Sequence, residues 1–213
     1  MEITWYGHSC FRITERGMAT VVTDPYDHTK IGYSELSLRG DIVTISHDAP
    51  GHNHIKAVKS NKWQIDGPGE YEIGGVFLTV VPTGKKDKQG NGQNMVIILD
   101  YEGVTVGHLG DLDTVPSRKE VDAFGNVDVL LIPVGGGKGL SAAKATEVIN
   151  LIEPGIVIPM HYSTPDTKVT LDSLGAFLKQ IGLSDKAETE ESLKVSKRDI
   201  PEETRVVVLS YKH

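Results

Sequence analysis

Residues 127–137 read VDVLLIPVGGG, a nearly continuous apolar run that three glycines end. A run of this length without polar alternation is typical of a strand buried on both faces, as in a parallel sheet. A second such run, GIVIPM, occupies residues 155–160. Between them, residues 141–151 have apolar side chains at helical spacing, and Ser141 can cap the first turn. This order of strand, helix and strand predicts an α/β fold for the second half of the chain.

The first half of the chain is rich in predicted short strands, and one more strand is predicted near the end of the second half. We predict strands at residues 3–6, 10–13, 19–23, 41–46, 62–66, 71–73, 76–82, 95–101, 103–108 and 204–211. Residues 171–181 form a second predicted helix, and the charged residues 186–201 are interpreted as a loosely packed connection. Two sheets covered by outer helices fit this order, although composition alone does not distinguish them from another α+β arrangement.

Length and composition favour a soluble protein with one domain over residues 1–213. The net charge of −7 argues against nucleic acid or an acidic membrane as a partner, which leaves a small-molecule substrate. The apolar runs are too short to span a bilayer, and the N-terminus lacks the pattern of a signal peptide. The single cysteine, Cys10, excludes an internal disulfide, so a cytoplasmic location is expected. The oligomeric state is not indicated by the sequence.

Four potential metal ligands occupy similar places, at or just after predicted strand ends. His47 ends the strand DIVTIS, and His52 lies five residues later. Asp111 follows the strand VTVGHL, and His161 ends GIVIPM. Any one of them alone would be explained more simply as a cap of its strand end. Because neighbouring strand ends can meet at one rim, all four together favour a common site, and imidazole and carboxylate suit zinc or iron.

The chain resembles the metallo-β-lactamase superfamily, in particular the branch that includes L-ascorbate-6-phosphate lactonase and metal-dependent hydrolases. The resemblance covers about residues 1–182, in the correct order along the chain. It implies an αββα four-layer sandwich with two mixed sheets and helices on the outer faces. The segments that carry it are GHSCFRI (7–13), TDPY (23–26), TISHDAPGHN (44–53), DGPGEYEIGGVFLTVVPT (66–83), GHLGDLD (107–113), DVLLIPVGGG (128–137) and IPMHY (158–162).

The central motif of that superfamily, H-x-H-x-D-H, is incomplete in this chain. His47 matches its first histidine and His52 its last. Ala49 stands in the place of the second histidine, and Gly51 in the place of the aspartate. Neither alanine nor glycine has a side chain that can bind a metal.

The later ligand positions are also only partly retained. Asp111 matches the bridging aspartate of the family and His161 its final histidine. After the segment VVPT, where the family has an aromatic residue and then a histidine, this chain has Gly84 and Lys85.

The resemblance therefore implies one usable metal site instead of two. The first site of the family would retain only His47 and Asp111, too few for tight binding. The second would retain His52, Asp111 and His161, which suffice for an open site that holds one divalent ion, Zn or alternatively Mn or Fe. The second metal is predicted to be absent. Lys85 could occupy the lost site as a tethered cation, or extend from its loop into solvent.

Five other residues are secondary candidates for the pocket or its surroundings. Asp24 could support a ligand histidine through a hydrogen bond. His8 and His108 are near the site by resemblance, with structural roles as the alternative. Asp48 and His54 flank the incomplete motif and carry ligand atoms, but their spacing does not restore it.

The predicted function is that of a metal-dependent hydrolase with reduced or altered activity. Its metal would activate water for attack on a lactone, ester or phosphoester. Asp111 and His47 are the predicted catalytic residues, with His47 as a carrier of protons. The alternative is an inactive protein that binds a ligand or partner on the same scaffold.

Overall fold

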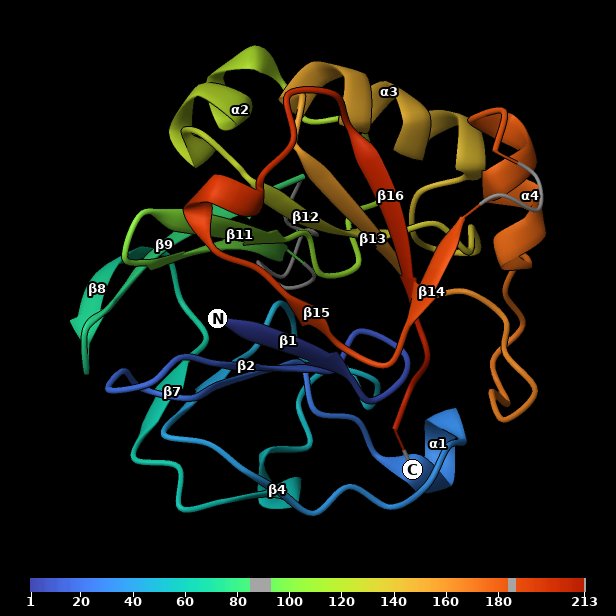
Figure 1. The fold of residues 1–213 in the computed structure, drawn as a ribbon. Coiled ribbons are helices and arrows are strands. Elements are labelled where there is room, and N and C mark those ends of the chain that lie inside the picture. The colour runs from blue at the N-terminus through green and yellow to red at the C-terminus, as the bar shows by residue number, and fades with distance from the viewer. Residues whose placement is uncertain (85–92, 184–186, 213) are drawn as a thin grey trace.

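The computed structural model describes residues 1–84, 93–183 and 187–212. In these residues the strands form two large β-sheets packed face to face, and one short two-stranded pair (Figure 1). The six-stranded sheet has the order β15-β1-β2-β3-β5-β7. Its strands are β1 (Glu2–Trp5), β2 (Phe11–Thr14), β3 (Val21–Thr23), β5 (Ile42–Thr44), β7 (Trp63–Ile65) and β15 (Leu193–Lys194). The short pair consists of β4 (Leu38–Arg39) and β6 (Val58–Lys59).

The eight-stranded sheet is mixed and has the order β14-β16-β13-β12-β11-β10-β9-β8. Its strands are β8 (Gly69–Ile73), β9 (Val76–Thr83), β10 (Asn94–Tyr101), β11 (Val104–His108), β12 (Val129–Pro133), β13 (Ile156–Met160), β14 (Glu188–Glu190) and β16 (Arg205–Leu209). Strands β8 to β11 form an antiparallel meander, whereas β11, β12, β13 and β16 are parallel. The two apolar runs of the sequence are thus the central parallel strands of this sheet.

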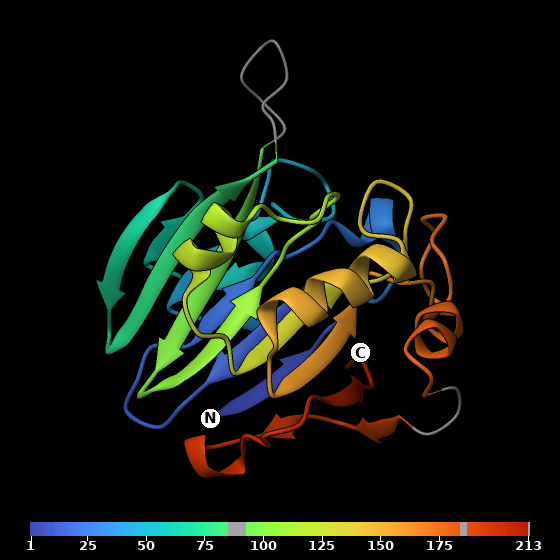
Figure 2. The same ribbon diagram turned by 90° about the horizontal axis from the view of Figure 1, so that it is seen from above.

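Both apolar runs are buried because the sheet is covered on two sides. All residues of β12 and β13 are buried. The helices α2 (Arg118–Phe124) and α3 (Ala142–Ile152) lie on the outer face (Figure 2). Their apolar side chains, such as Phe124 and Val148, join the main core. As predicted, Ser141 caps α3, since its side chain accepts a hydrogen bond from the backbone of Lys144. The helices are α1 (His28–Ile31), α2 (Arg118–Phe124), α3 (Ala142–Ile152) and α4 (Leu174–Gln180), with 3₁₀ turns η1 (Ile55–Ala57) and η2 (Lys197–Asp199).

The outer face of the six-stranded sheet is covered differently. Val22 and Val43, from adjacent strands, pack in a second core with Tyr26, Leu38 and Val58. The covering layer is therefore built from the chain around α1, β4 and β6, and its helical part is short. The α/β sandwich with two mixed sheets agrees with the fold class that the sequence and the resemblance predicted.

Two sequence predictions need correction. Residues 186–201 are not simply a loose connection, because they contain β14 and β15, and Leu193 and Val195 are buried. These two apolar residues lie two positions apart, a signal too short to stand out in a charged segment. The second helix also begins later than residue 171, since the backbone of Asp172 is already paired with Gly135 and Ser163.

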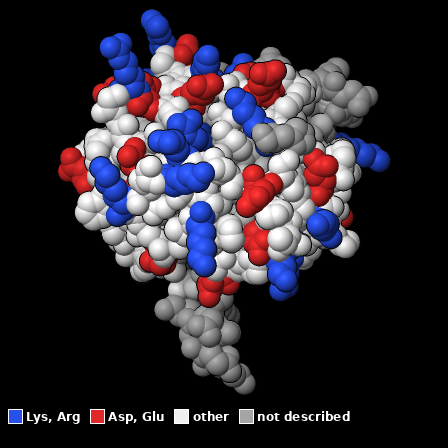
Figure 3. Space-filling view, turned by 90° about the horizontal axis from the view of Figure 1, so that it is seen from below, with Lys and Arg blue, Asp and Glu red and all other residues white. Residues whose placement is uncertain are grey.

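The described surface adds two observations. Lysine and arginine side chains are interspersed with aspartate and glutamate over the face that carries β4 (Figure 3). Among the described residues, no helix combines the length and the apolar character needed to cross a membrane.

Candidate metal centre

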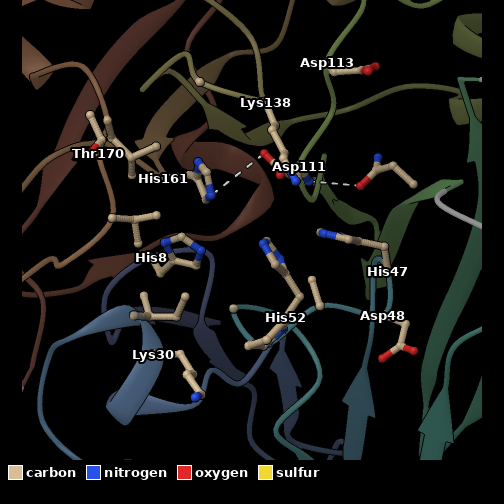
Figure 4. Close-up of a pocket in the computed structure, with 18 of the residues that line it drawn as sticks. His8, Lys30, His47, Asp48, His52, Asp111, Asp113, Lys138, His161 and Thr170 are labelled. Atoms are coloured by element: carbon tan, nitrogen blue, oxygen red, sulfur yellow. Dashed lines mark hydrogen bonds and ion pairs between the residues drawn. The ribbon is translucent and has the colours of Figure 1, made fainter.

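A pocket of about 690 Å³ opens where several strands of both sheets end. Its walls come from the turn between β1 and β2 and from the loops after β5, β11, β12 and β13. Figure 4 shows the imidazoles of His8, His47, His52 and His161 and the carboxylate of Asp111 around a common space. The predicted site residues that line the pocket are His8, His47, Asp48, His52, Asp111 and His161.

His52 is oriented by a buried carboxylate from a neighbouring strand end. Its Nδ1 lies 2.8 Å from Oδ2 of Asp24, the contact that the sequence interpretation of Asp24 requires. Ser46 donates to the same carboxylate from its backbone N (2.7 Å) and from its hydroxyl (2.5 Å). Burial alone would raise the pKa of Asp24, but His52, His108 and the Ser46 hydrogen bond bring it below its usual value. An ionised Asp24 keeps the proton of His52 on Nδ1 and leaves Nε2 for the pocket.

His8 and His161 are held by the backbone in an uncommon conformation. Their φ angles are 51° and 52°, and that of Asp24 is 39°, all in the left-handed region. The carbonyl of His8 accepts hydrogen bonds from the backbone N of His161 and from Nε1 of Trp5, each at 3.1 Å. Such conformations persist only when the surroundings enforce them, and they gather at functional sites.

Burial keeps both of these imidazoles neutral near pH 7. It lowers the pKa of His8 well below the usual value, and neighbouring histidines lower it further. Burial also lowers the pKa of His161 to about 4, although Asp111 opposes this shift. Neutral imidazole is the form that binds a metal.

Asp111 is positioned by a residue that the sequence analysis did not identify. Its backbone N donates to Oδ1 of Asn94 (2.9 Å), whose Nδ2 donates to the carbonyl of Leu109 (2.9 Å). Gly110 makes this turn at φ 60°, and a Cβ there would lie 2.3 Å from Asn94 Oδ1. The only sequence signal for Asn94 is a polar residue at the start of an apolar strand, which is too common to indicate a site.

His47 lies beside His52 at the open side of the pocket. Their ring centroids are 4.1 Å apart, and Nδ1 of His47 is 3.1 Å from the Ser46 hydroxyl. Burial lowers the pKa of His47, and the neighbouring His52 lowers it further. A histidine that is neutral and in contact with the pocket can accept a proton, so its predicted role remains open to test.

The donor set fits a divalent cation. Two overlapping groups bring ligand atoms within 4.8 Å of one another: His8, His52 and His161, and His47, His52 and Asp111. The predicted trio of His52, Asp111 and His161 is divided between these groups, while Nε2 of His161 lies 3.8 Å from Oδ1 of Asp111. That Asp111 oxygen is buried and has no hydrogen-bond partner among the residues that the structure describes. A cation among these groups would compensate a cost of about 1–3 kcal/mol for the unpaired oxygen.

The remaining candidates have different surroundings. His108 is fully buried, and its Nε2 lies 2.9 Å from the carbonyl of Ser9, so it holds the β1–β2 turn and does not line the pocket. His54 is also outside the pocket, because its backbone pairs with Pro25 at the start of η1. Asp48 is an exposed part of the rim and accepts a hydrogen bond from Asn53. The Lys85 hypothesis lies outside the described residues.

Comparison with known proteins agrees with this architecture. Residues 2–161 match the model of a beta-lactamase superfamily domain. The chain belongs to this family, which is the metallo-β-lactamase superfamily of the predicted resemblance.

Several individual proteins are also similar to this chain. A UPF0173 protein of Pyrococcus abyssi is 30% identical over 191 residues, and a UPF0173 metal-dependent hydrolase of Archaeoglobus fulgidus is 26% identical over 196. Each match covers 77% of this chain and 84% of the relative. A crystal structure from Thermotoga maritima, described as a candidate Zn-dependent hydrolase of the metallo-β-lactamase superfamily, is 36% identical with a TM-score of 0.80. That match covers 99% of both chains.

Proposed function

We propose that this protein is a hydrolase that binds one divalent metal ion at His52, Asp111 and His161. The observation that carries the proposal is the buried Oδ1 of Asp111, which lies beside the imidazole of His161 and has no hydrogen-bond partner in the described part of the chain. Such a carboxylate oxygen among imidazoles is a poor arrangement for a protein interior but a suitable one for a cation. The relatives named as metal-dependent hydrolases support the same activity.

His52 supports the proposal of a single ion. It belongs to both groups of ligand atoms, yet its Nδ1 is occupied by Asp24, so one ring nitrogen remains. One nitrogen binds one ion, and the two groups cannot both use it. This supports a single site, as Ala49 and Gly51 also do by having no ligand atoms.

A bound divalent ion supplies Lewis acidity and makes hydroxide available near neutral pH. Asp24 holds His52 in the orientation needed for this, and Asn94 does the same for Asp111. His47, at the pocket wall, accepts and returns a proton. The pocket volume of about 690 Å³ suits a small lactone, ester or phosphoester.

We expect low or altered activity compared with relatives that have the whole motif. At Gly51 the carboxylate that would orient water in the family is missing. The same loss motivates the alternative, an inactive protein that uses the pocket only to bind a ligand or partner. The two functions differ in metal content.

The deciding experiment is elemental analysis of protein purified without chelator. If the protein is a metal-dependent hydrolase, we expect about one Zn, Mn or Fe ion per chain. If it is an inactive binding protein, we expect none. Two tightly bound ions per chain would show that the assignment of a single site is wrong.

Activity is then assayed on a panel of a lactone, a p-nitrophenyl ester and a phosphodiester. We expect His161→Ala to lose both metal and hydrolysis. His28→Ala, which changes a histidine outside the pocket, is the matched control and should retain both. Lys85→Ala should also retain activity if that lysine takes no part in binding the metal.

A further inference from the structure

Gly51 stands where the motif of the family has a metal-binding aspartate, but in this structure a side chain at position 51 would collide with the imidazole of His8. A Cβ on Gly51 would lie 2.6 Å from Nε2 of His8 and 3.0 Å from its Cδ2. Contacts under 3.0 Å do not occur for real Cβ atoms, so one of the two groups would have to move. The imidazole of His8 thus fills the space next to residue 51 that an aspartate would enter.

The His8 imidazole is also directed toward the other potential ligands. Its ring centroid is 4.1 Å from that of His161 and 5.1 Å from that of His52 (Figure 4). The three imidazoles bring ligand nitrogens within 4.8 Å of one another, and all three residues are buried. Three imidazoles without hydrogen bonds between them gain little from this proximity unless they share a ligand.

The backbone holds His8 in this place at a cost. A non-glycine residue in the left-handed region is strained by about 1–3 kcal/mol, and His8 is paired there with His161, which has the same conformation. The two hydrogen bonds to the His8 carbonyl, from Trp5 and His161, stabilise the turn. The backbone of His161 is therefore connected directly to that of His8.

We propose that His8 is a direct ligand of the divalent ion and takes the place of the carboxylate that is missing at Gly51. The site would then consist of three imidazoles, from His8, His52 and His161, and the carboxylate of Asp111. The inference rests on the proposed function, because it concerns the same ion. Exchange of a carboxylate for an imidazole lowers the negative charge of the ligand set by one and favours metals that prefer nitrogen, such as zinc.

The first test measures binding of Co²⁺ and Zn²⁺ to protein stripped of metal by a chelator. His8→Asn is the variant of choice, because asparagine tolerates a left-handed backbone and is not a favoured zinc ligand. We expect the Kd for either ion to rise by about 10–100-fold or more. The visible absorption of bound Co²⁺, which reports the number and type of its ligands, should also change. His28→Ala should bind both ions as the unaltered protein does.

The second test removes the imidazole at position 8 and introduces a carboxylate at position 51. Gly51→Asp alone should weaken metal binding or lower the Tm, because its side chain meets His8. The double variant His8→Ala with Gly51→Asp removes that contact and supplies a carboxylate, so its affinity should exceed that of His8→Ala alone. This comparison remains informative if one single variant folds poorly.

The outcomes separate the two proposals. If His8→Asn binds Co²⁺ with unchanged affinity and spectrum, His8 is not a ligand, while the single-metal hydrolase stands. A double variant that binds no better than His8→Ala would also contradict the exchange. If the unaltered protein binds neither ion, the proposed function and this inference both fail.

Discussion

At the scale of single residues, Asp24 is fully buried, and its carboxylate interacts with polar groups next to the metal centre. It contacts His52 and Ser46, and it is the only acceptor among these three that carries a full negative charge. Its carboxylate determines which nitrogen of His52 faces the pocket. Loss of its charge should therefore affect metal binding although the residue does not line the pocket.

We predict that Asp24→Asn raises the Kd for Zn²⁺ by about 10–100-fold, because the amide can present a donor to His52 and no longer fixes its tautomer. Competition with a chromophoric chelator measures this change. Asp122→Asn is the control, since Asp122 is exposed on α2 outside the pocket and should leave the Kd within about 2-fold. If Asp24→Asn binds Zn²⁺ with the same Kd as the unaltered protein, the Asp24 carboxylate does not support the metal site.

Gly110 allows a prediction that separates backbone strain from steric conflict. Gly110→Ala adds a Cβ 2.5 Å from that of Ser46 and 2.3 Å from Oδ1 of Asn94. Gly103 also has a positive φ, of 87°, but open space around it. We expect Gly103→Ala to lower the free energy of unfolding by about 1 kcal/mol and Gly110→Ala to lower it by more. Urea denaturation measures both, and equal effects would mean that the turn before Asp111 adapts to a side chain.

At the scale of elements, Asp128 joins strand β12 to its neighbours. Its Oδ2 accepts hydrogen bonds from the backbone N and the hydroxyl of Thr105 at the start of β11, at 2.9 and 3.1 Å. Nζ of Lys197, in η2, lies 2.8 Å from the same oxygen. Burial would raise the pKa of Asp128, but these hydrogen bonds and that from Asn126 lower it below the usual value.

We predict that Asp128→Asn lowers the free energy of unfolding by about 1–3 kcal/mol at pH 7. Because the folded-state pKa is lowered, the contribution of the carboxylate is complete above its unfolded value of about 3.9 and is lost as the pH falls below it. The difference between the two proteins should therefore shrink from pH 5 to pH 3 in urea titrations. Asp122→Asn, at an exposed position of α2, should change stability by less than about 0.5 kcal/mol at every pH. A pH-independent difference for Asp128 would contradict the electrostatic explanation.

Elements with strong local signals were predictable, and those that depend on distant partners were not. The apolar runs of β12 and β13 and the Ser141 cap of α3 are visible in the sequence because burial on both faces and capping leave local patterns. The start of α4 and the strand β15 are not, because they depend on pairing with segments far away in the chain. A local sequence pattern does not indicate which distant segment a strand or loop will pair with.

At the scale of the whole molecule, the potential ligands come from both sheets. His8 and His52 follow strands of the six-stranded sheet, whereas Asp111 and His161 follow strands of the eight-stranded sheet. An ion bound by all four would connect the two layers at the rim that carries the pocket. Metal binding should thus stabilise the folded protein as a whole.

We predict that Zn²⁺ at about 100 times its Kd adds about 2.7 kcal/mol to the free energy of unfolding, which corresponds to a rise in Tm of about 5–10 °C. Thermal scans of chelator-treated protein with and without the ion measure the shift. His161→Ala, which removes one ligand, should show a much smaller rise. A shift of equal size in that variant would mean that the ion binds elsewhere.

Residue types and their order were sufficient to predict which potential ligands stand at the strand ends. The positions of His47, His52, Asp111 and His161 after apolar runs predicted that they would meet, and the resemblance implied without coordinates that Ala49 and Gly51 stand at ligand positions of the family motif. These are local properties of residue type and order. They do not depend on how the loops are folded.

The contact between Gly51 and His8, in contrast, follows from the three-dimensional arrangement of the chain. His8 lies 43 positions earlier in the chain, and its approach to Gly51 depends on a left-handed turn held by Trp5 and His161. Asn94 supports Asp111 in the same non-local way. Steric contact and hydrogen bonding act over a few ångströms in space, whereas sequence patterns describe neighbours along the chain. His8 is therefore a candidate ligand that the sequence pattern did not indicate and that only the contact between the two sheets brought to the pocket.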